Sequence, residues 1–151
     1  METVNHEYYV SLEVAKLLKE AGFNWKVRYM YRNNNPTLCI CTESPYRNVP
    51  KLNKCPMYWQ YAAPTLEIAQ RWLREVKGIE FDLCWHMTLD NQYKYAYAIK
   101  IKSIWKGLDK GKEIEVPSMD CLEAETCFNT FEEAQEAGIK KAVEILLKEG
   151  K

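Results

Sequence analysis

Histidine and glycine are both scarce in this chain of 151 residues, which contains two histidines and six glycines. A loop that cradles a phosphate needs several glycines close together, and the patterns GxGxxG, GxxxxGK[ST], GxSxG and HExxH do not occur. The carboxylates are numerous but dispersed, and no pair stands out as an acid and a base. We therefore predict no catalytic residues, no cofactor and a protein that is not an enzyme.

The chain also lacks long apolar runs and a net charge. No apolar segment approaches the ~20 residues that are needed to span a bilayer, and the segment Met1 to Glu7 has neither a basic region nor a signal core. Lys+Arg and Asp+Glu each total 21, so no overall charge attracts nucleic acid or an anionic membrane. We expect a cytoplasmic protein with no membrane partner, for which a partner protein or self-association is favoured over nucleic acid.

The clearest structural unit runs from Ala63 to Trp105. Thr65 can accept a hydrogen bond from a first-turn N–H and is predicted to cap a helix. Gly78 can adopt the left-handed conformation that ends it. Apolar residues recur between them at three- and four-residue spacing, which is typical of one buried helix face. The predicted face consists of Leu66, Ala69, Trp72, Leu73 and Val76.

Two alternating runs follow this helix and predict an antiparallel hairpin. In the first run, Ile79, Phe81, Leu83, Trp85 and Met87 alternate with Glu80, Asp82, Cys84 and His86. The second run covers residues 93–102, with tyrosines and isoleucines against lysines and alanines. The period of two predicts that the ring side chains lie buried between sheet and helices while the charged residues face solvent.

Three segments begin alike, at Ser11, Thr65 and Thr130, each with a hydroxyl cap, an apolar residue, a glutamate and then an alanine at the fifth position. They predict helices over residues 11–21, 65–77 and 130–149. The likeness has two readings: capping physics selects the same residues at any helix start, or the chain contains a duplicated α-β-β unit with halves at 8–62 and 63–128.

The rest of the chain completes a predicted order of α-β-β-(β)-α-β-β-(β)-α. Strands are expected near 25–31, 37–42 and 57–62, and short ones at 113–116, ended by Pro117, and at 125–128. Because the links between strands read as hairpins, we predict a single α+β domain over 1–151, with three helices on one face of one or more antiparallel sheets that total about five to six strands. The order of the strands within the sheet is not specified by the pattern.

Six cysteines are expected to be reduced thiols in a cytoplasmic protein. Cys39 and Cys41, and Cys121 and Cys127, are the close pairs, but neither has the spacing of a zinc knuckle. Buried free cysteine acting as a small hydrophobe is the preferred interpretation, and no metal site is predicted.

Charge is distributed unevenly along the chain. Residues 23–62 and 93–112 are rich in Lys and Arg, whereas residues 113–136 hold eight acids and no base. Residues 43–57 contain three prolines and little periodicity, and irregular loops of this kind often carry function. A candidate binding surface there combines local positive charge with aromatics: Tyr46, Arg47, Lys51, Lys54, Tyr58 and Trp59.

Three function classes follow from these observations. The favoured one is a binding or accessory protein without catalysis. The first alternative is a nucleic-acid-binding module that uses the basic hairpins and their aromatics for phosphate contact and base stacking. The second alternative is a small enzyme whose site is assembled from distant residues.

The segments SLEVAKLLKEAGFN, APTLEIAQRWLREVKGI and NTFEEAQEAGIKKAVEILLKE resemble a group of small proteins from phages, prophages and other mobile elements of gut bacteria. The likeness covers the three predicted helices and the strand after the second. It implies an intracellular protein of mobile-element origin, and it carries over no activity and no site residues.

Overall fold

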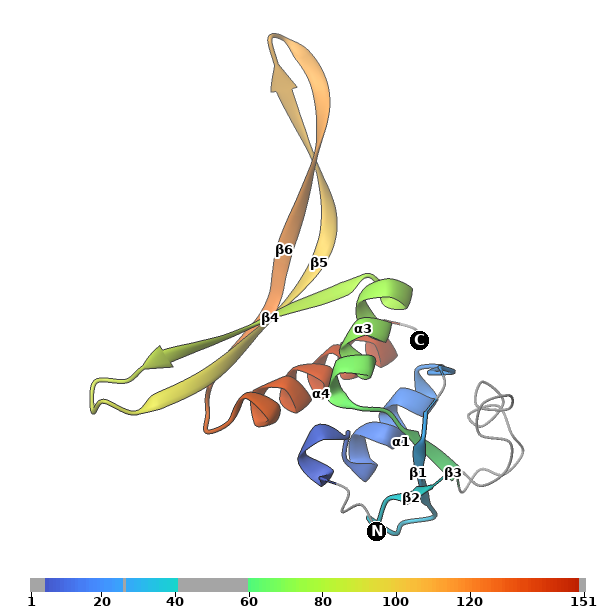
Figure 1. Ribbon diagram of the computed structural model, residues 1–151. Helices are drawn as coiled ribbons and strands as arrows, with labels where there is room; N and C mark the ends of the chain where they lie inside the picture. The colour runs from blue at the N-terminus through green and yellow to red at the C-terminus, as the bar shows by residue number, and fades with distance from the viewer. Residues whose placement is uncertain (1–4, 26, 41–59, 150–151) are drawn as a thin grey trace.

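The computed structural model describes residues 5–25, 27–40 and 60–149 and shows an α+β protein. Figure 1 presents the chain from its N-terminus in blue to its C-terminus in red. In order, the elements are the 3₁₀ helix η1 (His6–Tyr8), α1 (Leu12–Glu20), β1 (Tyr29–Arg32), β2 (Cys39–Ile40), β3 (Gln60–Ala63), α3 (Leu66–Lys77), β4 (Ile79–Met87), β5 (Tyr93–Asp109), β6 (Lys112–Phe128) and α4 (Phe131–Glu149).

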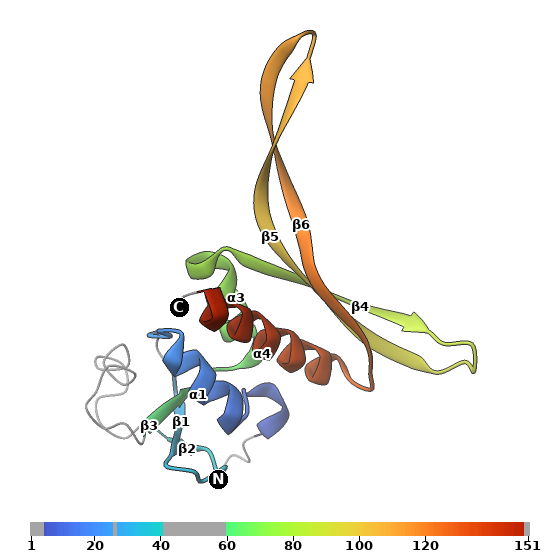
Figure 2. The same cartoon turned by 180° about the vertical axis from the view of Figure 1, so that it is seen from behind.

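The strands form two antiparallel sheets, one in the order β2-β1-β3 and one in the order β4-β5-β6. Helix α4 contacts α1, α3 and the second sheet, so it lies at the centre of the body. Two hairpins leave this body in different directions, as the opposite views of Figures 1 and 2 both show. One is the far end of β4 and β5; the other, here called the arm, comprises residues 102–119 of β5 and β6, beyond the reach of β4.

The predicted helices are confirmed, and their caps explain where they begin. The hydroxyl of Ser11 accepts from the N–H of Val14 at 3.3 Å, and that of Thr65 accepts from Ile68 at 3.2 Å. Thr130 accepts from the N–H of Glu133 at 3.1 Å. These bonds satisfy first-turn donors that have no partner inside a helix. Gly78 ends α3 with a φ of 70°, as predicted.

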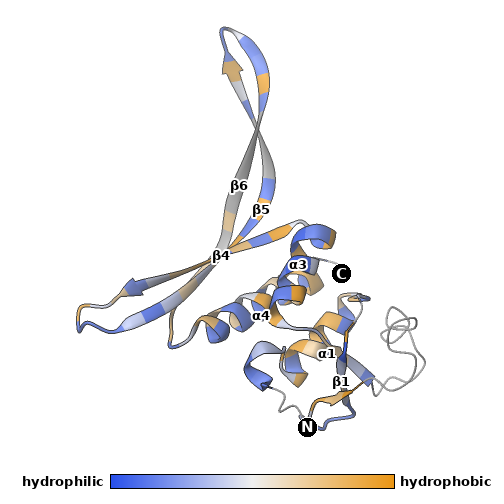
Figure 3. Ribbon diagram, viewed as in Figure 1, coloured by the Kyte–Doolittle hydropathy of each residue, from blue (hydrophilic) through white to orange (hydrophobic). Residues whose placement is uncertain are grey.

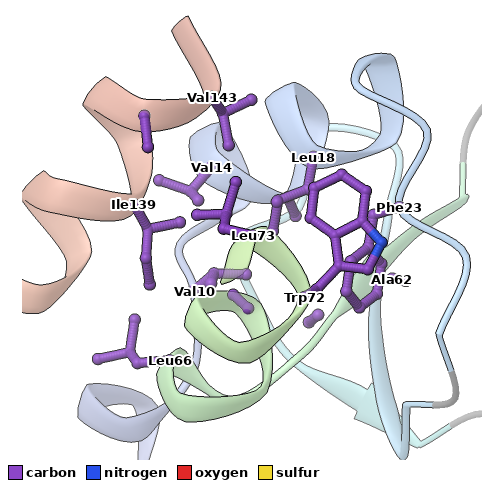
Figure 4. Packing of buried hydrophobic residues seen from close by; sticks show 14 of the residues in the cluster. Val10, Val14, Leu18, Phe23, Ala62, Leu66, Trp72, Leu73, Ile139 and Val143 are labelled. Carbon is purple, nitrogen blue, oxygen red and sulfur yellow. The ribbon is translucent and has the colours of Figure 1, made fainter. Parts of the chain in front are cut away.

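The body core lies where α1, α3 and α4 meet the first sheet (Figure 4). Trp72 of α3 is its largest fully buried side chain and meets the ring of Phe23 edge-on at a centroid distance of 5.4 Å. Leu18 of α1 and Ile139 of α4 are fully buried in the same cluster. The core therefore joins segments that lie more than a hundred residues apart, which explains why the helices depend on one another for burial.

Helix α4 approaches the second sheet at Gly138, where a glycine in mid-helix would otherwise weaken the helix. A Cβ at this position would lie 3.3 Å from both Phe81 and Tyr97, whose rings fill the space. Both rings are buried. The absence of a side chain at Gly138 thus allows the helix to lie directly on the base of the β4–β5 hairpin.

The β5–β6 hairpin is longer than the sequence predicts. Residues 112–128 form one strand, whereas we expected a short strand ended by Pro117. The turn at Lys110 and Gly111 has φ values of 51° and 81°, the type I′ geometry whose twist suits a two-residue hairpin. Bonded and non-bonded pairs alternate from the bonded pair Asp109–Lys112 next to the turn, so Pro117 opposite Ile104 belongs to a non-bonded pair. Its backbone nitrogen therefore faces away from β5, and the missing N–H removes no hydrogen bond between the strands.

Burial differs from simple one-sided patterns in two places. Tyr29, Met30 and Tyr31 are all buried, so both faces of β1 are covered. Val76, which was expected on the buried face of α3, is exposed near the end of that helix, so that prediction is wrong. The two sheets differ in strand order, so they give no support to the internal repeat, which stays a prediction.

None of the helices in the described ranges is both long enough and apolar enough to cross a membrane.

Candidate functional site

The binding surface expected from the sequence cannot be assessed from the structure. All of its residues, Tyr46, Arg47, Lys51, Lys54, Tyr58 and Trp59, lie outside the described residues. The basic segment 23–62 is therefore described only in part, and no conclusion about a shared basic surface follows from it.

The cysteines are not buried hydrophobes, and that interpretation is wrong where it can be checked. Cys84, Cys121 and Cys127 are exposed and Cys39 is half-buried. Within the ranges that the structure describes, no three His, Cys, Asp or Glu side chains gather as metal ligands. Cys41 and Cys55 lie outside those ranges.

A groove of about 390 Å³ separates the start of α1 from α4. Its polar side chains are mainly glutamates, which would be the natural acids and bases of an enzyme. Ser11, Glu13, Val14, Phe128, Glu133, Glu136, Ala137 and Lys140 line it.

Each glutamate in this groove has a partner, and two of them connect α1 with α4. Glu136 accepts from the backbone N–H of Ser11 at 2.7 Å, and Glu133 accepts from the backbone N–H of Asn129 at 3.1 Å. Glu13 pairs with Lys140 at 2.9 Å. The groove thus holds helix-capping and bridging contacts among its charged groups.

Tyr31 lies buried next to this region and donates from its hydroxyl to the carbonyl of Val10 at 2.6 Å. Burial, and secondarily the charge of Glu136, raises the pKa of Tyr31 to about 12, compared with 10.0 for a free tyrosine. From pH 10 to 12 the unfolded chain therefore loses a proton that the folded chain retains, so stability falls as pH rises.

We expect the wild type to lose about 2 kcal/mol more than Tyr31→Phe across this window, measured by denaturant unfolding at each pH. Parallel pH profiles for the two proteins would contradict this assignment.

The far end of the β4–β5 hairpin carries large exposed apolar side chains. Trp85 is 62% exposed, Met87 52% and Tyr93 59%, and Leu89 in the turn is wholly exposed. This group of four is here called the distal patch. The prediction that these rings are buried is therefore wrong at this end of the sheet, although it holds at the base for Phe81.

The patch exists because α4 covers only part of the sheet face. Figure 3 shows apolar and polar residues alternating along the start of β4. By the period of two, Trp85 and Met87 share a face with Phe81, which α4 covers. Helix α4 begins at Phe131, whose ring meets Tyr95 edge-on at 6.2 Å. Beyond that contact, Trp85 and Tyr93 contact each other, with centroids 5.4 Å apart, but no helix from the described residues lies over them.

Charge on the arm is balanced across the two strands. Lys106 of β5 lies opposite Glu115 of β6, and Asp109 of β5 lies opposite Lys112 of β6. Lys100 also forms an ion pair with Asp82 of β4. The second basic segment of the sequence therefore presents charges of both signs over these residues.

Comparison with known proteins identified no matching family, and neither a curated protein nor a solved structure matches the chain.

Proposed function

We propose that this chain is a non-enzymatic binding protein that contacts another polypeptide through the distal patch. The observation that carries the proposal is the cluster of exposed apolar side chains at one end of the β4–β5 hairpin. Monomeric proteins seldom expose contiguous apolar surface of this kind, and aromatic residues with Met are enriched in protein interfaces. The proposal includes an origin in a phage or other mobile element, which rests only on the resemblance of the helix segments.

Trp85 is expected to dominate binding, because a large exposed ring that becomes buried in an interface commonly contributes about 2 kcal/mol or more. Replacing Trp85 by serine should reduce recovery of a cross-linked partner from host cells by about 30-fold. The measurement is quantitative mass spectrometry of proteins captured by the full chain. The thermal midpoint of the variant should stay near that of the wild type, since Trp85 contributes little to the core.

Val76→Ser provides the matched control, because Val76 is 51% exposed on α3 and lies outside the distal patch. Its captured proteins should equal those of the wild type. Equal capture by wild type and Trp85→Ser would overturn the proposal, as would single-strand nucleic-acid affinity that falls steeply with salt.

The enzyme alternative is less well supported, since the groove between α1 and α4 uses its glutamates in contacts that hold the fold together.

A further inference from the structure

We propose that two copies of this chain associate edge to edge through their β4 strands, antiparallel, about a two-fold axis that passes between the two copies of Cys84. This inference rests on the proposed function and names the polypeptide that the distal end binds, which is a second copy. Strand β4 is suited to it because it is an edge strand of its sheet, without a neighbour on its outer side among the described residues.

The ladder between β4 and β5 fixes which backbone groups of β4 face outward. The N–H of Thr88 donates to the carbonyl of Gln92 at 2.8 Å, in the same register that joins the two strands. Bonded and non-bonded pairs alternate in an antiparallel ladder, so even-numbered residues of β4 point their backbone toward β5. The odd-numbered residues point theirs to the open edge.

One contact confirms this alternation. The carbonyl of Phe81 accepts from the side-chain amide of Gln70 on α3 at 3.5 Å, so it faces away from β5. Helix α3 thus occupies the edge near the start of β4. The edge from Leu83 to Met87 lies beyond that contact and presents backbone donors and acceptors.

The sequence of β4 is self-complementary in one register. With Cys84 opposite its own copy, Leu83 lies opposite Trp85 of the second copy, and both are odd-numbered residues that can exchange two backbone hydrogen bonds. Symmetry repeats this pair, which gives four bonds. On the other face, Asp82 lies opposite His86 of the second copy. Moving the register so that Trp85 faces itself would lose both Asp–His pairs.

The two open edges of this sheet differ in a way that favours β4. Natural edge strands avoid unwanted pairing with prolines, bulges and irregular register. Strand β6 has such features, since Pro117 lies in it and its register with β5 shifts twice. Strand β4 has no proline and pairs with β5 over nine residues without a shift. Its edge is thus left competent for pairing, and the exposed Trp85 borders it.

Cys84 gives a direct test of the register. Opposed residues of a non-bonded pair lie about 4.5 Å apart between Cα atoms, within disulfide range. Diamide treatment of the full chain should therefore convert most of a dimer to a Cys84–Cys84 cross-link, located by peptide mass spectrometry and absent in Cys84→Ser. In Asp82→Cys on the Cys84→Ser background, the two introduced thiols lie about 13 Å apart and should not cross-link.

Light scattering supplies the second measurement, and the expected mass is twice the 17.8 kDa of one chain. His86→Asp places two like charges opposite Asp82 and should weaken the dimer at least about tenfold. His86→Lys places opposite charges at these positions and should leave the dimer intact. Within one chain, position 86 lies opposite Lys94 of β5, so an aspartate there gains a cross-strand partner of opposite charge. The monomer of this variant should therefore be no less stable, and loss of the dimer would not reflect unfolding.

Three outcomes would overturn the inference: a monomer at all concentrations from about 1 µM to 1 mM, a dimer that does not cross-link at Cys84, or equal dimer affinity for both His86 variants. A monomer whose Trp85→Ser variant still loses a captured partner would leave the proposed function standing. A Cys84-linked dimer would support the inference whether or not other proteins are captured.

Discussion

Replacing Trp72 by alanine is expected to lower the free energy of unfolding by about 3–5 kcal/mol, the largest single effect in this protein. The indole is 1% exposed and meets Phe23 edge-on, so its removal leaves a cavity at the junction of α3 with the first sheet. Because the stability of a domain this size is typically about 5–15 kcal/mol, the variant should lose a large part of it. Urea unfolding followed by circular dichroism measures the change.

Trp72→Phe is the informative comparison. The indole Nε1–H has no hydrogen-bond partner among the described residues, so phenylalanine removes a buried donor that is already unsatisfied. The ring also keeps part of the volume. We expect this variant to lose about half as much stability as Trp72→Ala, and a loss of less than ~1 kcal/mol for the alanine variant would show that the cavity collapses.

Gly138→Leu is expected to cost at least about 1–3 kcal/mol by overpacking. The first added atom would already lie 3.3 Å from Phe81 and Tyr97, and the remaining atoms must enter the space that those rings occupy. The helix can accommodate leucine only by moving off the sheet. Calorimetry measures the loss, and greater accessibility of Tyr97 to proton exchange would locate it.

Lys148→Leu provides the matched control, because it places the same side chain on an exposed position of the same helix and should change stability by less than about 0.5 kcal/mol. Gly138→Ala separates helix propensity from steric overlap. Alanine favours the helix by about 1 kcal/mol, while its Cβ makes a tight contact with Phe81 and Tyr97. A leucine variant as stable as the wild type would show that α4 does not press on the sheet.

The helices could be predicted from the sequence because their signals are local. The hydroxyl caps at Ser11, Thr65 and Thr130, and the glycine that ends α3, act within a few residues of themselves. The first nine residues of the second sheet were predictable for a similar reason, since period-two alternation along β4 is a property of adjacent residues.

The distal patch and the arm could not be predicted because they depend on distant elements. Alternation shows which face of β4 is apolar, but it does not show that α4 begins at Phe131 and so leaves Trp85 uncovered. Proline in a strand reads as a stop unless the strand is known to lie at an edge, and that fact depends on the sheet order. The groove likewise unites Ser11 with Glu136, a contact that no local pattern indicates.

The sequence shows how many charged residues the segments 23–62 and 93–112 contain, but it does not show whether those charges form a positive surface. The acids of residues 113–128 were visible in the sequence, and the structure places them along β5, with Glu115 opposite Lys106. Placing a type I′ turn at Lys110 and Gly111 would have predicted that residues 113–128 pair with β5. A lysine followed by glycine between alternating runs is compatible with such a turn.

The central place of α4 has a consequence for biosynthesis. This helix contacts α1, α3 and the β4–β5–β6 sheet, and Glu136 on it bonds to Ser11 across 125 residues of chain. A nascent polypeptide that emerges from the ribosome in order can form its early helices but cannot cover the sides of α1 and α3 that contact α4 until α4 has left the exit tunnel. Translation pauses ahead of residue 131 would therefore extend the time during which those sides of α1 and α3 are available to chaperones.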